Sequence, residues 1–169
     1  NAKSFGSLYG VTKFYDNLES LSEDQTIDAV YIASPNAFHC SQAIQMMKAG
    51  KHILCEKSVA SNMNEAEEMF RTAAENNVIL LEAMRSVFDP GMDALKANLN
   101  KLGVIRRATV NYCQYSSRYD SFLQGQDHNI FRRDCSAGAL MDIGTYCVHG
   151  LLCLFGKPQQ VVGFSDMIR

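Results

Sequence analysis

Several familiar functional motifs are missing from this 169-residue sequence. It contains no G-x-G-x-x-G, no G-x-x-x-x-G-K-[ST], no H-E-x-x-H and no G-x-S-x-G. The usual marks of a dinucleotide loop, a triphosphate loop, a zinc peptidase and a serine hydrolase are therefore absent. The six cysteines form no C-x-x-C pair, and together with the four histidines they show no zinc-ligand spacing. We therefore expect no metal centre.

Basic clusters and long apolar runs are also missing. The net charge is −2 and the pI is about 6.1, and the doublets Arg106-Arg107 and Arg132-Arg133 are interpreted as solvated. A nucleic-acid-binding protein would instead carry clustered lysine and arginine. The best apolar run, residues 151–155, is far shorter than the roughly 18 residues of a membrane span. We expect no nucleic-acid partner and no membrane partner.

The cysteines lack the dense spacing of a secreted disulfide scaffold. Their even number keeps disulfides open as an alternative. Most of them, however, lie among apolar residues, where a free thiol behaves as a small hydrophobic group. We interpret them as reduced, structural thiols of a cytoplasmic protein. They stand at positions 40, 55, 113, 135, 147 and 153.

The first half of the chain alternates apolar strands with helical patterns. Such alternation predicts an α/β fold whose parallel sheet carries helices on both faces. The chain opens with Asn1 inside a helical pattern, which we interpret as a piece of a longer protein. Helix caps are expected at Asp16 or Asn17 and at Asn62, which has Glu65 three residues later. The predicted strands are 11–15, 27–33, 51–55 and 78–84, and the predicted helices include 2–9 and 38–49.

The pattern changes after Met84. A helix is expected to begin at Asp89-Pro90 and end near Gly103. Loose polar–apolar alternation then predicts a longer strand over 104–115, of the kind found in sheets with one solvated face. A polar loop (116–136), an apolar and therefore buried helix (137–155) and a strand (160–168) follow. We place a domain boundary near residue 85, giving domains 1–85 and 86–169.

Polar residues follow the three strong strands. Ligands bind outside the carboxyl ends of strands in parallel α/β sheets. The convergence of these ends predicts a binding site, although Glu56-Lys57 alone could be a surface ion pair worth less than about 1 kcal/mol. His39 could instead be a helix-start residue with satisfied hydrogen bonds. The candidate residues are Ala33, Ser34, Pro35, Asn36 and His39 after the first strand, Glu56 and Lys57 after the second, and Glu82 and Arg85 after the third.

A polar stripe runs along the apolar helix 137–155. Asp142, Tyr146 and His149 are spaced by four and three residues, which places them on one face. A carboxylate is rarely buried without a partner, so the stripe is a candidate pocket lining. The alternative is that Asp142 only fixes a neighbouring loop while Tyr146 packs.

Two separated segments resemble one family of enzymes. The similarity extends over essentially the whole chain and points to the nicotinamide-dependent oxidoreductases grouped with glucose–fructose oxidoreductase and inositol dehydrogenase. That family has Pro after the Glu-Lys pair, often with a cis bond, whereas this chain has Ser58. Its Arg after the third strand is Val87 here, with Arg85 two residues earlier as a substitute. The segments are residues 30–36 (VYIASPN) with His39 and 49–57 (AGKHILCEK), and residues 138–146 (GALMDIGTY).

The resemblance implies a fold and a set of roles. The fold would be a partial Rossmann-type parallel sheet, lacking the first βαβ unit, followed by part of an α+β domain with a mainly antiparallel sheet. Asn36 and its turn would border the nicotinamide of NAD or NADP, with His39 and Arg85 as further contacts. Glu56 would hold a ribose hydroxyl, and Lys57 would sit beside the reacting carbonyl. Tyr146, as in the branch with dihydrodiol dehydrogenase, would exchange the proton, and Asp142 would orient the substrate.

Hydride transfer between the nicotinamide and a sugar, polyol or related small molecule is the implied reaction, in a full-length parent that forms a homo-oligomer. Isolated residues 1–169 would have little or no activity. A non-catalytic nucleotide-binding or regulatory protein on the same scaffold is the first alternative. A thiol- or metal-dependent protein is the second, and it would use Cys135, Cys147, Cys153, His128 and His149.

Overall fold

A three-stranded parallel sheet forms the centre of the first half of the molecule. The computed structural model describes residues 2–165. The strands are β1 (Ala29–Ile32), β2 (His52–Cys55) and β3 (Leu80–Glu82), in the spatial order β1-β2-β3. Val30 pairs with Ile53, which pairs with Leu80. The three apolar runs therefore form the parallel sheet that their pattern predicts.

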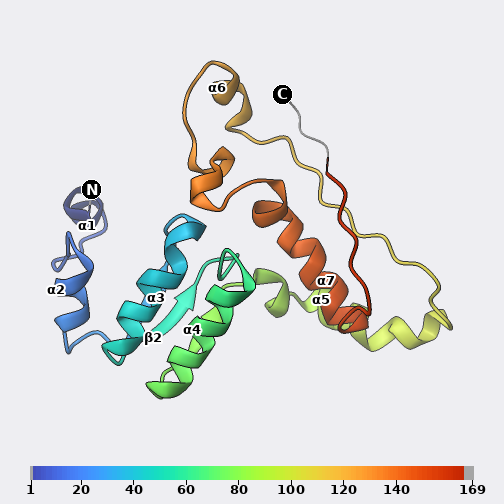
Figure 1. The fold of residues 1–169 in the computed structure, drawn as a ribbon, viewed down its shortest axis with the longest axis horizontal. Coiled ribbons are helices and arrows are strands. Elements are labelled where there is room, and N and C mark those ends of the chain that lie inside the picture. Colours follow the sequence, from blue (N-terminus) through green and yellow to red (C-terminus); the bar gives the residue numbers. More distant parts are fainter. Residues whose placement is uncertain (1, 166–169) are drawn as a thin grey trace.

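Helices cover one face of this sheet. α3 (His39–Lys48) and α4 (Met63–Glu75) pack side by side against it (Figure 1). The opposite face exposes Tyr31, Leu54 and Leu81, each more than 40% accessible. The prediction of helices on both faces is thus wrong for residues 2–165, although an all-parallel sheet normally has both faces covered. The buried core under α3 and α4 consists of Ile32, Cys40, Ala43, Met46, Met47, Ile53, Cys55, Ala60, Met69, Ala73 and Leu80.

Local capping signals place the helix ends. Asn17 caps α2 (Leu18–Glu23) by accepting a hydrogen bond from the Ser20 N–H. Asn62 caps α4 in the same way through the Glu65 N–H, while Glu65 accepts from the Ser61 N–H one residue before the cap. α1 (Ala2–Leu8) is followed by Gly10 at φ +70°, and Asp89 caps α5 (Pro90–Asn98). These predicted helix starts are confirmed.

Three predicted strands do not form. Residues 11–15 and 104–115 make no strand hydrogen bonds within the described part of the chain, and neither do residues 160–165. Residues 166–168 of the last prediction lie outside the described residues. Figure 1 shows the two later segments as extended chain running beside the helices. A strand needs a partner for its backbone groups, and no neighbouring strand meets these segments among residues 2–165.

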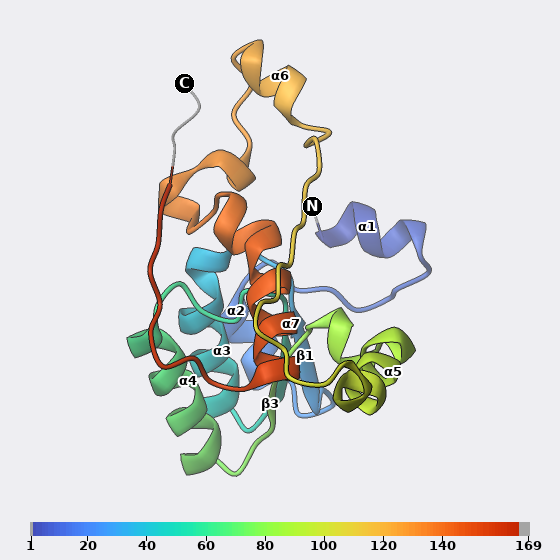
Figure 2. The same ribbon diagram turned by 90° about the vertical axis from the view of Figure 1, so that its right-hand side faces the viewer.

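The second half consists of short helical elements. A 3-10 turn, η2 (Arg85–Phe88), leads into α5 and a second such turn, η3 (Leu99–Leu102). The predicted polar loop carries α6 (Tyr119–Leu123), which both views place far from α4 (Figures 1 and 2). The turns η4 (Asn129–Phe131) and η5 (Arg133–Cys135) then precede a π-helical turn, η6 (Leu140–Gly144), and α7 (Thr145–Phe155).

The apolar helix is less buried than its composition predicts. Leu140 is 69% exposed and Val148, Leu152 and Phe155 are each more than 40% exposed, which corrects the expectation of a buried helix. By length and composition, the helical segment from Arg133 to Phe155 is able to cross a membrane. The expectation that no segment reaches that length is therefore wrong. One such helix is weak evidence of a span, and the absence of a membrane partner stays a prediction.

All six cysteines are free thiols. Cys40, Cys55 and Cys135 are buried, whereas Cys113 is exposed. Burial in the core raises the pKa of the Cys55 thiol to about 12. Because the thiolate is the reactive form, Cys55 is an inert core residue.

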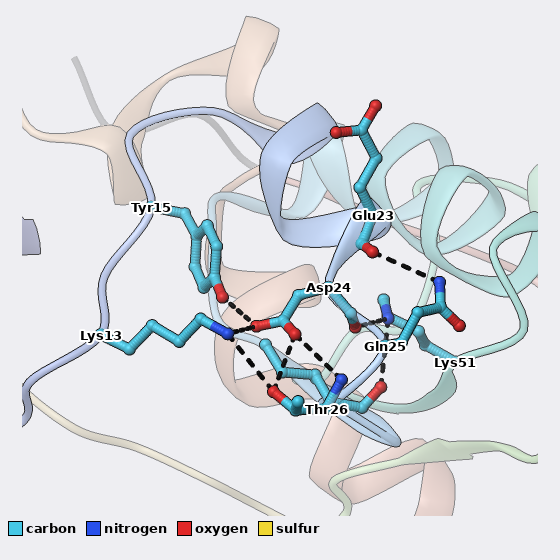
Figure 3. A network of polar contacts seen from close by, with 8 residues as sticks. Lys13, Tyr15, Glu23, Asp24, Gln25, Thr26 and Lys51 are labelled. Carbon is cyan, nitrogen blue, oxygen red and sulfur yellow. Dashed lines mark hydrogen bonds and ion pairs between the residues drawn. The ribbon is translucent and has the colours of Figure 1, made fainter.

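A carboxylate at the amino end of the sheet organises a polar network (Figure 3). Asp24 forms an ion pair with Lys13 and accepts hydrogen bonds from the Tyr15 hydroxyl and from both the N–H and hydroxyl of Thr26. Buried Lys51 donates to the backbone carbonyls of Asp24 (2.7 Å) and Ile27 (3.1 Å). Lys13, with Tyr15 and Thr26, holds the pKa of the Asp24 carboxyl well below its usual range. The network fixes the chain that enters β1.

Asp24→Asn is expected to make the free energy of unfolding less dependent on pH in acid. Because the folded-state pKa is lowered, the carboxylate's contribution is fully present above its unfolded value of about 4 and is lost as the pH falls below it. Urea unfolding should show a stability gap between the unsubstituted chain and Asp24→Asn that narrows from about pH 7 to about pH 3. Asp28→Asn, at an exposed aspartate without a described side-chain bond, is the control. A gap of equal size at both pH values would contradict the prediction.

Candidate active site

The carboxyl ends of β1 and β2 carry the first polar groups of the site. Asn36 begins the 3-10 turn η1 (Asn36–Phe38) after β1, and Glu56 and Lys57 follow β2 directly. One oxygen of the Glu56 carboxylate accepts a hydrogen bond from the Tyr31 hydroxyl on the neighbouring strand, and the other lies 3.2 Å from the Lys57 backbone nitrogen. That bond from Tyr31 raises the pKa of the Tyr31 phenol. The predicted convergence of these two strand ends is present in the fold.

Lys57 is held by an aspartate 85 positions further along the chain. Its Nζ lies 2.7 Å from Asp142 Oδ1 and 2.6 Å from the Asp142 backbone oxygen. The Lys57 side chain is 15% exposed and that of Asp142 is 46% exposed. The pairing of Lys57 with Asp142 argues against the simple surface pair with Glu56. The peptide bond between Lys57 and Ser58 is cis.

Asp142 is presented by a π-helical turn. Sequence periodicity predicts a regular helix over 137–155, but the helix starts as η6 before it becomes α7. Short π-helical segments occur frequently at functional sites. Ser136 at φ +52° and Gly138 at φ +111° turn the chain into η6. In consequence, Asp142 faces the end of β2.

Two further hydrogen bonds join the same surfaces. Asn36 Nδ2 donates to the Ser136 backbone oxygen (3.0 Å), and Ser58 Oγ donates to the Met141 backbone oxygen (3.2 Å). Together with the Lys57–Asp142 pair, they fix η5 and η6 against the strand ends. The candidate site therefore lies between the sheet and the second half of the chain.

Tyr146 lies beside Lys57. The Lys57 Nζ is 5.2 Å from the centroid of the Tyr146 ring, within the range of a cation–π contact. The ring also packs against Tyr112, with centroids 5.7 Å apart. Lys57, Asp142 and Tyr146 thus form one cluster.

Two cavities adjoin this cluster. Lys57 and Asp142 line one of them, and Tyr146 lines the other. The first, of about 110 Å³, is lined by Pro35, Asn36, Lys57, Asn129, Ile130, Cys135, Ala137 and Asp142. The second, of about 290 Å³, is lined by Arg85, Ser86, Asp89, Tyr112 and Tyr146. Lys57 and Tyr146 are neighbours, but each lines its own cavity.

Comparison with known proteins identifies the first half of the chain. Residues 1–84 match the sequence model of an oxidoreductase family with an NAD-binding Rossmann fold. These residues belong to that oxidoreductase family. The strand ends described above therefore belong to a sheet of the NAD-binding Rossmann type.

Relatives of this family match almost the whole chain. It is 47% identical over 160 residues to scyllo-inositol 2-dehydrogenase (NADP(+)) IolU of Bacillus subtilis, covering 95% of the chain and 49% of the relative. It is 32% identical over 162 residues to trans-1,2-dihydrobenzene-1,2-diol dehydrogenase of Mus musculus, covering 95% and 47%. The chain thus spans about half the length of the curated relatives it matches.

Solved oxidoreductases share the fold. The 3-ketoreductase KijD10 of Actinomadura kijaniata, in complex with NADP and TDP-benzene, is similar with a TM-score of 0.72 and 26% identity over 92% of the chain and 46% of that protein. A levoglucosan dehydrogenase in complex with NADH and L-sorbose has a TM-score of 0.75 and 25% identity, over 92% and 41%. The resemblance inferred from the two sequence segments is confirmed.

Other candidate residues predicted from the sequence support the fold around the site. His39 is fully buried, and its two ring nitrogens lie 2.9 Å from the backbone oxygens of Ser34 and Ser58. The geometry therefore favours the alternative of a satisfied helix-start residue, because the ring has no exposed surface for a cofactor. The Ser34 hydroxyl bonds Gln42, and Glu82 accepts from the Val59 N–H.

The remaining predicted residues lie nearer to the site. Pro35 lines the first cavity, whereas Arg85 lines the second, beside Tyr146. Ala33 is exposed at the end of β1. Asn129 and Ile130, which also line the first cavity, were not predicted. They lie in a polar loop, and only the apolar Ile130-Phe131 pair inside it signalled a packed turn.

The described residues also bear on the metal alternative predicted from the sequence. Within residues 2–165, no group of three or more His, Cys, Asp or Glu side chains could hold a metal ion. Of the residues in the thiol or metal alternative, His149 and Cys153 are in contact, with Sγ 3.4 Å from Nε2, while His128 bonds Ser121. This pairing supplies too few ligands for the metal alternative.

Proposed function

We propose that these residues form the nicotinamide- and substrate-facing part of an NAD(P)-dependent dehydrogenase that acts on CH–OH groups of a polyol, diol or sugar. The observation that carries the proposal is the position of Lys57. It follows a strand of an NAD-binding fold, pairs with Asp142 and lies over the Tyr146 ring.

The residues at the strand ends fit the nicotinamide half of such a cofactor. The Asn36 turn would border the nicotinamide, and Glu56 would accept a ribose hydroxyl, since each carboxylate oxygen can accept more than one hydrogen bond. When bound, the nicotinamide supplies the hydride chemistry. IolU, named for NADP(+), supports NADP as the cofactor of this chain.

Lys57 has one donor left for the substrate. An ammonium group carries three N–H donors, and two of them are directed to Asp142. The third is available to the substrate oxygen, where a fixed positive charge stabilises developing oxyanion character. Asp142 therefore acts as the residue that orients Lys57, in addition to its predicted role toward the substrate.

Tyr146 is the proposed proton donor and acceptor. Its hydroxyl makes no hydrogen bond to any residue in the described part of the chain, while its ring is held by Lys57 and Tyr112. A phenol held in place but not engaged can exchange a proton with the substrate oxygen as the hydride moves. We further propose the division into a cofactor domain (1–85) and a substrate domain (86–169). A homo-oligomeric parent and a cytoplasmic location stay predictions.

The test needs a protein that contains residues 1–169 and has the full length of the relatives. Below, this protein is called the completed protein. We expect NADPH to form when it is given NADP with scyllo-inositol or with trans-1,2-dihydrobenzene-1,2-diol, followed by absorbance. Cofactor binding without turnover of either compound or of a wider polyol panel would favour the non-catalytic alternative.

A further inference from the structure

The second cavity lies between the 3-10 turn η2 and α7. It measures about 290 Å³ and is lined by Arg85, Ser86, Asp89, Tyr112 and Tyr146. Ligand pockets in proteins begin at roughly 300 Å³, so this one suits a small molecule. Tyr146 belongs to its wall, and Lys57 Nζ, which lines the first cavity, lies 5.2 Å from the Tyr146 ring, so a substrate oxygen in contact with both residues would lie where this cavity adjoins Lys57.

Several polar groups of the wall are not used within the chain. Among residues 2–165, neither the Arg85 guanidinium nor the Tyr146 hydroxyl has a hydrogen-bond partner in the protein. Asp89 accepts from the Gly91 N–H through Oδ1 (2.8 Å), and Oδ2 has no described partner. The residues that line this cavity of small-molecule size therefore carry donors and an acceptor that the chain itself leaves unused, as the recognition of several hydroxyl groups requires.

Unlike Arg85 and Tyr146, Ser86 has a side-chain hydrogen-bond partner within the chain. Ser86 Oγ lies 3.0 Å from His149 Nδ1. His149 follows Tyr146 by three residues on the same side of α7, and Cys153, one turn later, has its Sγ 3.4 Å from Nε2 and 3.7 Å from Nδ1 of the His149 ring. A serine hydroxyl has one donor and two acceptor sites. After the bond to His149, the hydroxyl of Ser86, a residue that lines the cavity, retains capacity for one more partner.

We propose that the Ser86–His149 pair is a specificity subsite that binds a substrate hydroxyl other than the one that reacts. Ser86 makes the contact, and His149 is a positioning residue that fixes the Ser86 hydroxyl. The proposal rests on the proposed function, because it places the reacting hydroxyl at Tyr146. The substrate class that it favours is the polyhydroxylated ring over the simple alcohol.

Calorimetric titration of the NADP-loaded completed protein tests the subsite without requiring turnover. Scyllo-inositol is titrated as the polyol and cyclohexanol as the ring with a single hydroxyl. Ser86→Ala is expected to raise the Kd of scyllo-inositol about tenfold, the loss of one hydrogen bond to a polar pocket, and to leave the Kd of cyclohexanol unchanged. His149→Leu should match Ser86→Ala, and the double variant should be no weaker than either, because both remove the same contact.

Two variants separate positioning from general damage. His149→Asn keeps a side-chain polar atom near the Nδ1 position and should restore most of the affinity that His149→Leu loses. Val148→Ala, at an exposed position of the same helix, should bind both ligands as the unsubstituted protein does.

Four outcomes would overturn the subsite: unchanged scyllo-inositol affinity in Ser86→Ala, equal loss for both ligands, additive loss in the double variant, or no binding of scyllo-inositol to the unsubstituted protein. Binding with the expected pattern but without NADPH formation would instead refute the proposed function and leave the subsite standing.

Discussion

Lys57→Ala in the completed protein is expected to lower kcat for polyol oxidation by about 100-fold or more, as does removal of a group that stabilises an oxyanion. Among residues 2–165, the ammonium is the one charge that lies against both Asp142 and the Tyr146 ring. Its loss removes the positive charge from the position of the substrate oxygen. Steady-state kinetics with NADP and scyllo-inositol measure the effect, and cofactor affinity should change much less than kcat.

Lys48→Ala is the matched control for this variant. Lys48 is an exposed lysine in the last turn of α3, with no described contact to the site. Its kinetics should equal those of the unsubstituted protein. If Lys57→Ala retained full turnover, Lys57 would be a structural partner of Asp142 and no more.

Tyr146→Phe is expected to lower kcat by about 10²- to 10⁴-fold, the usual effect of removing a positioned acid or base. The substitution keeps the ring, so the contacts with Lys57 and Tyr112 persist and thermal stability should be unchanged. Kinetics and a thermal melt of the same preparation separate the two effects. Because only the hydroxyl is removed, a loss of turnover at constant stability assigns the proton step to that group.

Tyr9→Phe, at a tyrosine that is 66% exposed near the start of the chain, should have no effect on kcat. Turnover that survived in Tyr146→Phe would contradict the proton role. Another group would then have to donate the proton. The candidates would be Lys57 and two residues that line the second cavity, Arg85 and Ser86.

The parts of the fold that the sequence predicts well are those with local signals. The three strands of the sheet are apolar and short, and the caps at Asn17, Asn62 and Asp89 are side-chain patterns that act within a few residues. The extended segments 104–115 and 160–165 fail as strands because strand formation depends on a partner, which alternation of polar and apolar residues cannot reveal.

The sequence indicates which residues form the candidate site better than it indicates the contacts between them. The convergence of the strand ends follows from the topology of a parallel sheet. The Lys57–Asp142 bond spans 85 positions and depends on a π-helical turn, for which the 3.6-residue periodicity gives no signal. The sequence leaves His39 open between a cofactor contact and a helix-start residue, because only the fold brings the backbone oxygens of Ser34 and Ser58 to the two nitrogens of its buried ring.

The seam between the strand ends and the η5–η6 segment is joined by hydrogen bonds from Asn36, Lys57 and Ser58. Such bonds exchange for water at a small net free energy, in contrast to buried apolar packing. Opening this junction would consequently cost less free energy than separating an apolar interface of the same size, and raised ionic strength would act on the Lys57–Asp142 ion pair rather than on the uncharged bonds.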